Sequence, residues 1–148
     1  MKPEPTLRER ALKLLAAREH SRLELRRKLS PHAESPGQLE SLLDELTSKR
    51  QQSDERFADL RSRVLSRKYG AGRIAHELRA KGVSDELVAA SVSAARATEF
   101  ARAREAWRKR FGTPPANALE KARQMRFLQG RGFPFDVIRA VVGGSEED

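Results

Sequence analysis

The residue types that usually carry out chemistry are scarce in this 148-residue sequence. There is no cysteine, which excludes disulfides, thiolate metal sites and a thiol nucleophile. The three histidines, His20, His32 and His76, lie far apart and form no His-Glu-x-x-His or comparable ligand pair. We expect each of them to be a surface or helix-end residue. Since no paired carboxylates or activated serine stand out either, we predict a protein that is not an enzyme, with no catalytic, cofactor-binding or metal-binding residues.

One glycine-rich segment, Tyr69-Gly70-Ala71-Gly72-Arg73, precedes an expected helix and could cradle an anion with its backbone amides. It lacks the preceding strand and the lysine of a nucleotide-binding loop. A plain turn between two helices is therefore the favoured interpretation, with a phosphate site as the alternative.

Positive charge is the main functional signal. The chain has 30 Lys and Arg against 21 Asp and Glu, a net charge of +9, and a pI near 10.6. Such a balance favours nucleic acid, an acidic protein groove or an anionic membrane surface as partner, and the alternative is simply a well-solvated surface. Residues three or four apart share a helix face, so Arg22 with Arg26 and Arg123 with Arg126 form basic faces.

Internal repeats indicate which elements position these basic residues. The segment 20–29 is similar to 69–78, with Leu25 matching Ile74, and 78–88 is similar to 128–138 at identical spacing. Three units emerge, at roughly 6–52, 53–96 and 97–144, and each is expected to hold three helices. Residues 1–52, 53–96 and 97–148 each carry a net charge of +3. This even distribution predicts a continuous basic surface along the array better than one DNA-reading helix.

Capping chemistry predicts where the helices begin and end. A hydroxyl lies three residues before a reciprocal acceptor in three expected capping boxes: Thr6 with Glu9, Ser21 with Glu24, and Ser35 with Gln38. Ser53 and Ser84, each followed by two acids, are expected to start two more helices. Lys81-Gly82-Val83 and Arg131-Gly132-Phe133 are typical helix stops, in which the glycine is left-handed.

Helical periodicity predicts one buried stripe on each of two helices: Leu39, Leu42, Leu43 and Leu46 on one, and Phe57, Leu60, Val64 and Leu65 on the other. With 38% hydrophobic and 5% aromatic residues, the core must be built mainly from aliphatic side chains on packed helices. We expect Trp107 and Tyr69 to lie in the core instead of serving as base-stacking platforms. Residues 113–117 are expected to form a turn or loop, and the acidic tail 145–148 to be disordered.

The N-terminal residues show no signal peptide, and no run approaches the roughly 18 apolar residues of a membrane span. We therefore expect a cytoplasmic protein with no membrane partner.

Short motifs from all three units occur together and in order. They are Ala11-Leu12-Lys13-Leu14-Leu15, His20-Ser21 and Lys28-Leu29; then Asp54-Glu55-Arg56-Phe57-Ala58, Tyr69-Gly70, Arg73-Ile74 and Lys81-Gly82-Val83; then Arg126-Phe127-Leu128 and Arg131-Gly132-Phe133. On these motifs the chain resembles the RecX family over about residues 7–142. It departs from the usual pattern in the loop from Ser30 to Gly37, where a lysine-glycine stop is typical, and at Ala71, where proline is common.

The resemblance implies an all-α fold, an elongated and curved array of three tandem three-helix repeats. We place these repeats at residues 1–52, which include an N-terminal extension, 53–96 and 97–144, followed by the acidic tail 145–148. The family implies a non-catalytic negative modulator of the RecA recombinase, without cofactors. It would bind the RecA filament on single-stranded DNA, with that DNA within the complex, and inhibit ATP hydrolysis, strand exchange and stimulated cleavage of the LexA repressor. We expect it to act as a monomer.

We predict that the surface for RecA or DNA is drawn from eight basic residues: Arg26, Arg27, Arg67, Arg73, Arg79, Lys81, Arg123 and Arg126. Two other functions fit the composition. One is a DNA-binding protein, sequence-specific or non-specific, in which one unit acts as a helix-turn-helix. The other is a structural scaffold that does not contact DNA.

Overall fold

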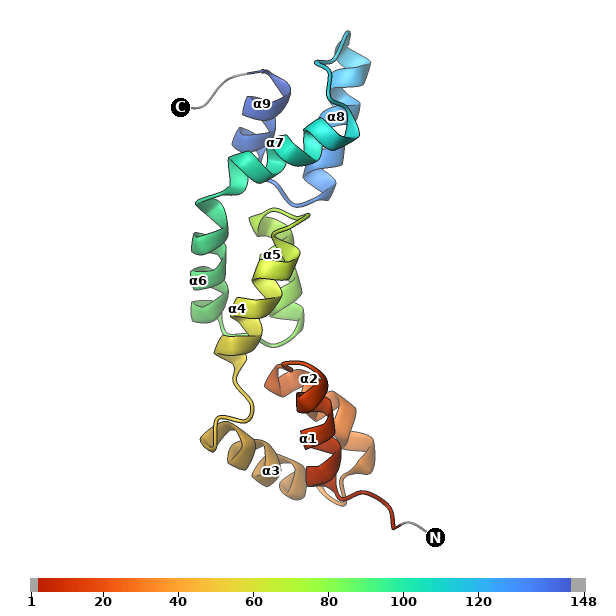
Figure 1. The fold of residues 1–148 in the computed structure, drawn as a ribbon, viewed down its shortest axis with the longest axis vertical. Coiled ribbons are helices and arrows are strands. Elements are labelled where there is room, and N and C mark those ends of the chain that lie inside the picture. The colour runs from red at the N-terminus through yellow and green to blue at the C-terminus, as the bar shows by residue number, and fades with distance from the viewer. Residues whose placement is uncertain (1–2, 145–148) are drawn as a thin grey trace.

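The computed structural model describes residues 3–144, and throughout this range the regular elements are helical. The helices are α1 (Leu7–Ala17), α2 (Arg22–Leu29), the 3-10 helix η1 (Ser30–His32), α3 (Pro36–Ser48), α4 (Asp54–Leu65), α5 (Ala71–Ala80), α6 (Asp85–Arg96), α7 (Glu99–Arg110), α8 (Ala118–Gly130) and α9 (Phe135–Val142). Successive sets of three helices follow one another along a long axis, with α1–α3 at one end of the molecule and α7–α9 at the other (Figure 1). The predicted all-α array of three-helix repeats is confirmed.

Each set of three consecutive helices surrounds its own cluster of buried side chains. The first helical group, α1–α3, packs around Leu25, Leu29 and Leu43, together with the predicted stripe of α3. The second group, α4–α6, packs around Ile74 and Leu78, and the third group, α7–α9, packs around a further cluster of aliphatic and aromatic side chains. The boundaries at 52/53 and 96/97 stay predictions, and the predicted acidic tail lies outside the described residues.

The surface area of the molecule reflects this linear arrangement. The chain exposes 9817 Å² at a mass of 16.7 kDa, whereas a compact monomer of that mass exposes about 7,600 Å². An array of small cores buries less surface per residue than one large core, because each group contacts only its neighbours.

Most helix starts follow the predicted caps. Thr6 and Ser21 each form a capping box with the glutamate three residues later, and Ser53 and Ser84 accept from the amides of their own first turns. The third reciprocal box is wrong. Ser35 accepts from the amide of Gln38 at 3.1 Å, but the Gln38 carboxamide accepts from the amide of Glu34 at 2.7 Å. The glutamine carboxamide thus bonds to the residue before the cap and holds the preceding loop against the helix.

The two predicted glycine stops are also present. Gly82 and Gly132 have φ angles of +76° and +87°, and the next amide in each case bonds back to the carbonyl of Leu78 or Leu128. This left-handed ending reverses the chain within two residues, so that α6 and α9 pack back on the helices before them.

The predicted stripe on α4 is partly wrong. Leu60 and Val64 are 49% and 48% exposed, and the buried face consists of Phe57, Ala58, Ser62 and Leu65. Small side chains at 58 and 62 let α4 pack closely against α6, which turns Leu60 and Val64 to one side of the contact.

His20 ends the loop before α2 and is 1% exposed, so it is a helix-end residue but not a surface one. Its Nδ1 lies 3.1 Å from the carbonyl oxygen of Arg18, and its Nε2 lies 2.9 Å from Nζ of Lys28. Burial lowers the pKa of His20 below its ordinary value, and the positive charges of Arg18 and Lys28 act in the same direction. His32 and His76 are exposed, as expected.

Candidate functional site

Two joints connect the three helical groups and determine which charged side chains meet. At the first joint, Glu24 of α2 is 6% exposed although it is ionisable. Its carboxylate accepts from Arg18 at 2.8 Å and from the Ser21 amide at 3.1 Å, and it lies 3.6 Å from Nζ of Lys81 in the second group. Burial alone would raise the pKa of Glu24, but these hydrogen bonds and positive charges outweigh it and lower the pKa to about 2.

A close packing contact and two hydrogen bonds complete the first joint. The left-handed Gly82 lies against Leu23, so that a Cβ added there would be 2.8 Å from the leucine side chain. The Asp54 carboxylate, at the start of α4, accepts from the backbone amide of Arg22 and from Gln52, both at 2.8 Å. The first two groups are therefore connected by both charge and close packing.

The second joint uses the glycine-rich segment before α5. The Gly70 amide donates to the carbonyl of Arg131 at 2.8 Å, and the Gly72 amide donates to the carbonyl of Gly132 at 3.1 Å. Between them, the Ala71 amide donates to the buried Glu99 carboxylate at 2.8 Å. The amides that a phosphate would need are thus occupied by the third group, which supports the predicted interhelical turn over a phosphate site.

Arg102 of α7 reinforces the second joint from the other side. Its guanidinium donates to the carbonyl oxygens of Ser66 at 2.9 Å, Tyr69 at 2.5 Å and Ala95 at 2.8 Å. These carbonyls follow α4 or end α6, so one side chain satisfies acceptors left over at two helix ends. Burial lowers the pKa of Arg102, against the attraction of Glu99.

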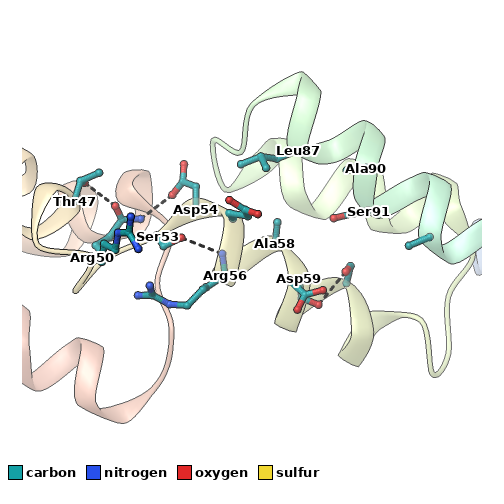
Figure 2. Close-up of a pocket in the computed structure, with 14 residues that line it drawn as sticks. Thr47, Arg50, Ser53, Asp54, Arg56, Ala58, Asp59, Leu87, Ala90 and Ser91 are labelled. Atoms are coloured by element: carbon teal, nitrogen blue, oxygen red, sulfur yellow. Dashed lines mark hydrogen bonds between the residues drawn. The ribbon is translucent and has the colours of Figure 1, made fainter.

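A cleft of about 800 Å³ opens beside the first joint, between the α3–α4 turn, α4 and α6 (Figure 2). Its floor includes the small side chains Ala58, Ala90 and Ser91. The polar groups at its edge hold the turn together: Thr47 donates to Gln52 at 2.8 Å, and Ser53 accepts from an amide of α4. Thr47, Gln52 and Ser53 are therefore already engaged in structural bonds.

A second cleft, of about 530 Å³, opens beside the second joint. We call it the basic cleft, because its lining contains six cations and one acid: Arg67, Lys68, Arg102, Glu105, Ala106, Lys109, Arg110, Phe127 and Arg131. The cations come from the turn after α4, from α7 and from the residue that follows α8. Phe127 lies under the guanidinium of Arg131, 4.7 Å from its ring centroid, and meets Phe111 edge to face at 5.4 Å.

The eight predicted binding residues do not gather into one patch. A carboxylate lies within 4.0 Å of four of them: Arg26 (Glu40, 2.6 Å), Arg73 (Glu77, 3.6 Å), Arg79 (Asp85, 3.9 Å) and Lys81 (Glu24, 3.6 Å). Arg73 also stacks on Tyr69, with 5.0 Å to the ring centroid. These pairs reduce the positive charge that the four residues present to a partner.

The other four predicted residues differ in position. Arg27 reaches across the first joint to the carbonyl oxygen of Ala80 at 3.4 Å. Arg67 lines the basic cleft, Arg123 lines a smaller cleft on α8, and Arg126 is exposed on the same helix. The role of all eight in binding stays a prediction.

Sequence reasoning did not select five of the six cations of the basic cleft as binding residues: Lys68, Arg102, Lys109, Arg110 and Arg131. The adjacent pairs Arg67-Lys68 and Lys109-Arg110 were the available signal, because each follows or ends a helix. Only the fold brings these pairs, which are about forty residues apart in sequence, to one cleft.

Within residues 3–144, no three His, Cys, Asp or Glu side chains cluster as a metal site would require. No helix in the same range has the length and apolar character needed to cross a bilayer.

Comparison with known proteins identifies the family. Models of the second and third three-helix domains of RecX match residues 53–92 and 97–142. A Regulatory protein RecX from Leptothrix cholodnii is 48% identical over 141 residues, which make up 95% of this chain and 90% of that protein. The chain belongs to the RecX family. The RecX protein of Chromobacterium violaceum is similarly close, at 46% identity over 97% of this chain and 93% of its own length.

Solved RecX structures share the fold. RecX from Lactobacillus salivarius superposes with a TM-score of 0.79 at 17% identity, covering 93% of both chains. A second structure of a regulatory protein RecX gives a TM-score of 0.78 at 18% identity, over 91% of this chain and 70% of that one. The predicted resemblance to RecX is therefore confirmed in sequence and in fold.

Proposed function

We propose that this RecX protein is a negative modulator of the RecA recombinase. It binds the RecA filament on single-stranded DNA and inhibits ATP hydrolysis, strand exchange and the coprotease activity that stimulates LexA cleavage. In this role it acts in the cytoplasm, as a monomer and without a cofactor, and takes part in recombination, DNA repair and the SOS response.

The elongated shape is the observation that carries this proposal beyond family membership. A filament presents the same protomer surface repeatedly, and a linear array can contact more than one protomer at once. The second contact is then intramolecular and raises the overall affinity without any new surface. The large exposed area for the mass of the chain suits such a partner.

The two joints support the proposal because they hold neighbouring groups against each other and place different clefts along the axis. The cleft at the first joint has three acids, Asp54, Glu55 and Asp59, beside the two arginines Arg50 and Arg56, whereas the cleft at the second joint has six cations and one acid. A binder with unlike surfaces at successive positions has a polarity, which matches a polar filament of protein on DNA.

The competing function, a helix-turn-helix protein that reads duplex DNA, suits the electrostatics less well. A reading helix brings its first turn to the base edges, close to phosphates. The first turn of α6 carries Asp85 and Glu86, and that of α9 carries Asp136. The first-turn amides of α5 are occupied within the second joint.

A titration of the protein into RecA, single-stranded DNA and ATP tests the proposal. We expect ATP hydrolysis and LexA cleavage both to fall with increasing protein, and no hydrolysis by the protein alone. Unchanged rates at saturating protein would refute the proposed modulation. Tight, sequence-dependent binding to duplex DNA in the absence of RecA would favour the helix-turn-helix function instead.

A further inference from the structure

We infer that the basic cleft binds the phosphodiester backbone of a single DNA strand without reading its bases. The inference deepens the proposed function, since it rests on that function for the identity of the strand, the DNA within the RecA filament. Binding of DNA by the cleft can nevertheless be measured without RecA.

Four cations of the basic cleft are available to a ligand. Arg102 is engaged by three carbonyl oxygens, and Arg131 stacks on Phe127 at 4.7 Å from the ring centroid, closer than Arg110 at 5.8 Å. The remaining four, all exposed, are Arg67, Lys68, Lys109 and Arg110. In the described part of the chain, a carboxylate comes within 4.0 Å of just one of these four, where Lys109 lies 4.0 Å from Glu105.

In the first helical group, by contrast, several arginines are paired with carboxylates. There Arg22 bonds to Glu40 and Asp44, Arg26 bonds to Glu40, and Arg8 pairs with Glu45. Although each third of the chain has the same formal charge, carboxylates neutralise these three arginines, whereas four exposed cations line one concave surface at the second joint. A concave wall of like charges attracts a polyanion more strongly than the same charges spread over a convex surface.

The chemistry of the cleft favours phosphate over base recognition. Arginine donates in a planar fork that matches a phosphate, and lysine acts as a mobile point charge. The aromatic ring in the lining is not open to stacking: Arg131 and Arg110 lie 4.7 and 5.8 Å from the centroid of Phe127, and Phe111 meets its edge. Without a stacking platform, binding should be independent of base sequence.

An acidic protein segment is the other polyanion that such a cleft could attract. A DNA strand is favoured because it carries condensed counterions, and their release supplies binding free energy each time a cation neutralises a phosphate. A short acidic peptide has little such atmosphere. This difference can be measured as the dependence of affinity on salt.

The experiment measures fluorescence anisotropy of labelled oligo(dT) and oligo(dA) with the full-length protein alone, from about 50 to 200 mM NaCl. With four phosphates neutralised at about 0.7 each, the plot of log K against log[NaCl] should have a slope of about −2.8 for both oligonucleotides. The Arg67→Ala/Lys68→Ala variant should reduce the magnitude of that slope by about 1.4 and weaken binding at low salt by about tenfold or more.

Two further variants make the test specific. Lys109→Ala/Arg110→Ala removes the other wall of the cleft and should have the same effect as the first variant. The control Lys13→Ala/Arg104→Ala removes the same charge from exposed positions on α1 and on α7 outside the cleft lining, and should change affinity less than about twofold. Circular dichroism melting should show that all three variants fold.

Four results would overturn the inference: no binding by the wild type at about 100 µM protein, wild-type affinity in both cleft variants, an equal loss in the control, or equal competition by a polyglutamate peptide of the same charge.

A parallel RecA ATPase titration separates the two proposals. If the wild type inhibits RecA while the cleft variants bind DNA normally, the proposed function stands and the cleft assignment fails. If the wild type leaves RecA unaffected while the cleft variants lose DNA affinity, the cleft assignment stands and the proposed function fails.

Discussion

Replacing Glu24 by glutamine should loosen the first joint by an amount that can be worked from its pKa. Glutamine keeps the volume and can still accept from the Ser21 amide, but it leaves Arg18 and Lys81 without their anion. A pKa lowered from 4.5 to about 2 corresponds to about 3 kcal/mol, at about 1.4 kcal/mol for each unit. Because the side chains of Arg18 and Lys81 are 49% and 38% exposed, solvent screening reduces the expected loss to about 1–2 kcal/mol.

Urea unfolding of wild type and Glu24→Gln across pH tests this value. The folded-state pKa of Glu24 lies below its ordinary value, so the stabilisation is present above about pH 4.5 and is lost as the pH falls toward 2. The gap between the two proteins should therefore be about 1–2 kcal/mol at pH 7 and should narrow in acid. The control Glu4→Gln, at a side chain that is 94% exposed, should have no comparable effect. Equal stability at pH 7, or a gap that stays constant down to pH 2, would refute the reasoning.

Three other substitutions or conditions test the packing. Gly70→Ala would put a Cβ 2.6 Å from the carbonyl oxygen of Gly132, so we expect a stability loss of about 1–3 kcal/mol, seen as a lower thermal midpoint. Trp107→Phe removes the 2.8 Å bond from the indole nitrogen to the buried Gln124 carbonyl and should cost about 1–3 kcal/mol in urea unfolding; an unchanged midpoint would contradict this. Folding favours the neutral form of His20, because burial lowers its pKa below 6.5. Stability should therefore decrease as the pH falls below about 6.5, and His20→Gln should remove that part of the slope, with NMR titration of the imidazole as the direct check.

Local chemistry made much of the fold predictable from sequence. A hydroxyl cap and its partner lie three residues apart, so Ser21 with Glu24 could be identified without knowing the tertiary structure. The glycine stops at 82 and 132 were predictable for the same reason. The buried face of α4 was not, because periodicity places Leu60 and Val64 on a helix face but does not say which neighbouring helix covers it.

The candidate site was less predictable, since it depends on contacts between segments far apart in sequence. Arg26 was predicted to bind on the basis of its helix face, yet it bonds to Glu40 on the next long helix. The basic cleft exists because the end of α4 meets α7 and α8. Counting charges in each unit could not distinguish paired arginines from free ones, and that distinction now determines where a polyanion would bind.

The second joint has a consequence for how this family can diverge. Its bonds from the amides of Gly70 and Gly72 end on main-chain carbonyl oxygens, and main-chain groups are the same in every sequence. Mutation elsewhere can therefore replace surface and core side chains while the angle between neighbouring groups persists. RecX from Lactobacillus salivarius shares the fold, with a TM-score of 0.79, at only 17% identity. Lineages could then change the charges along the array without redesigning the backbone that spaces those charges.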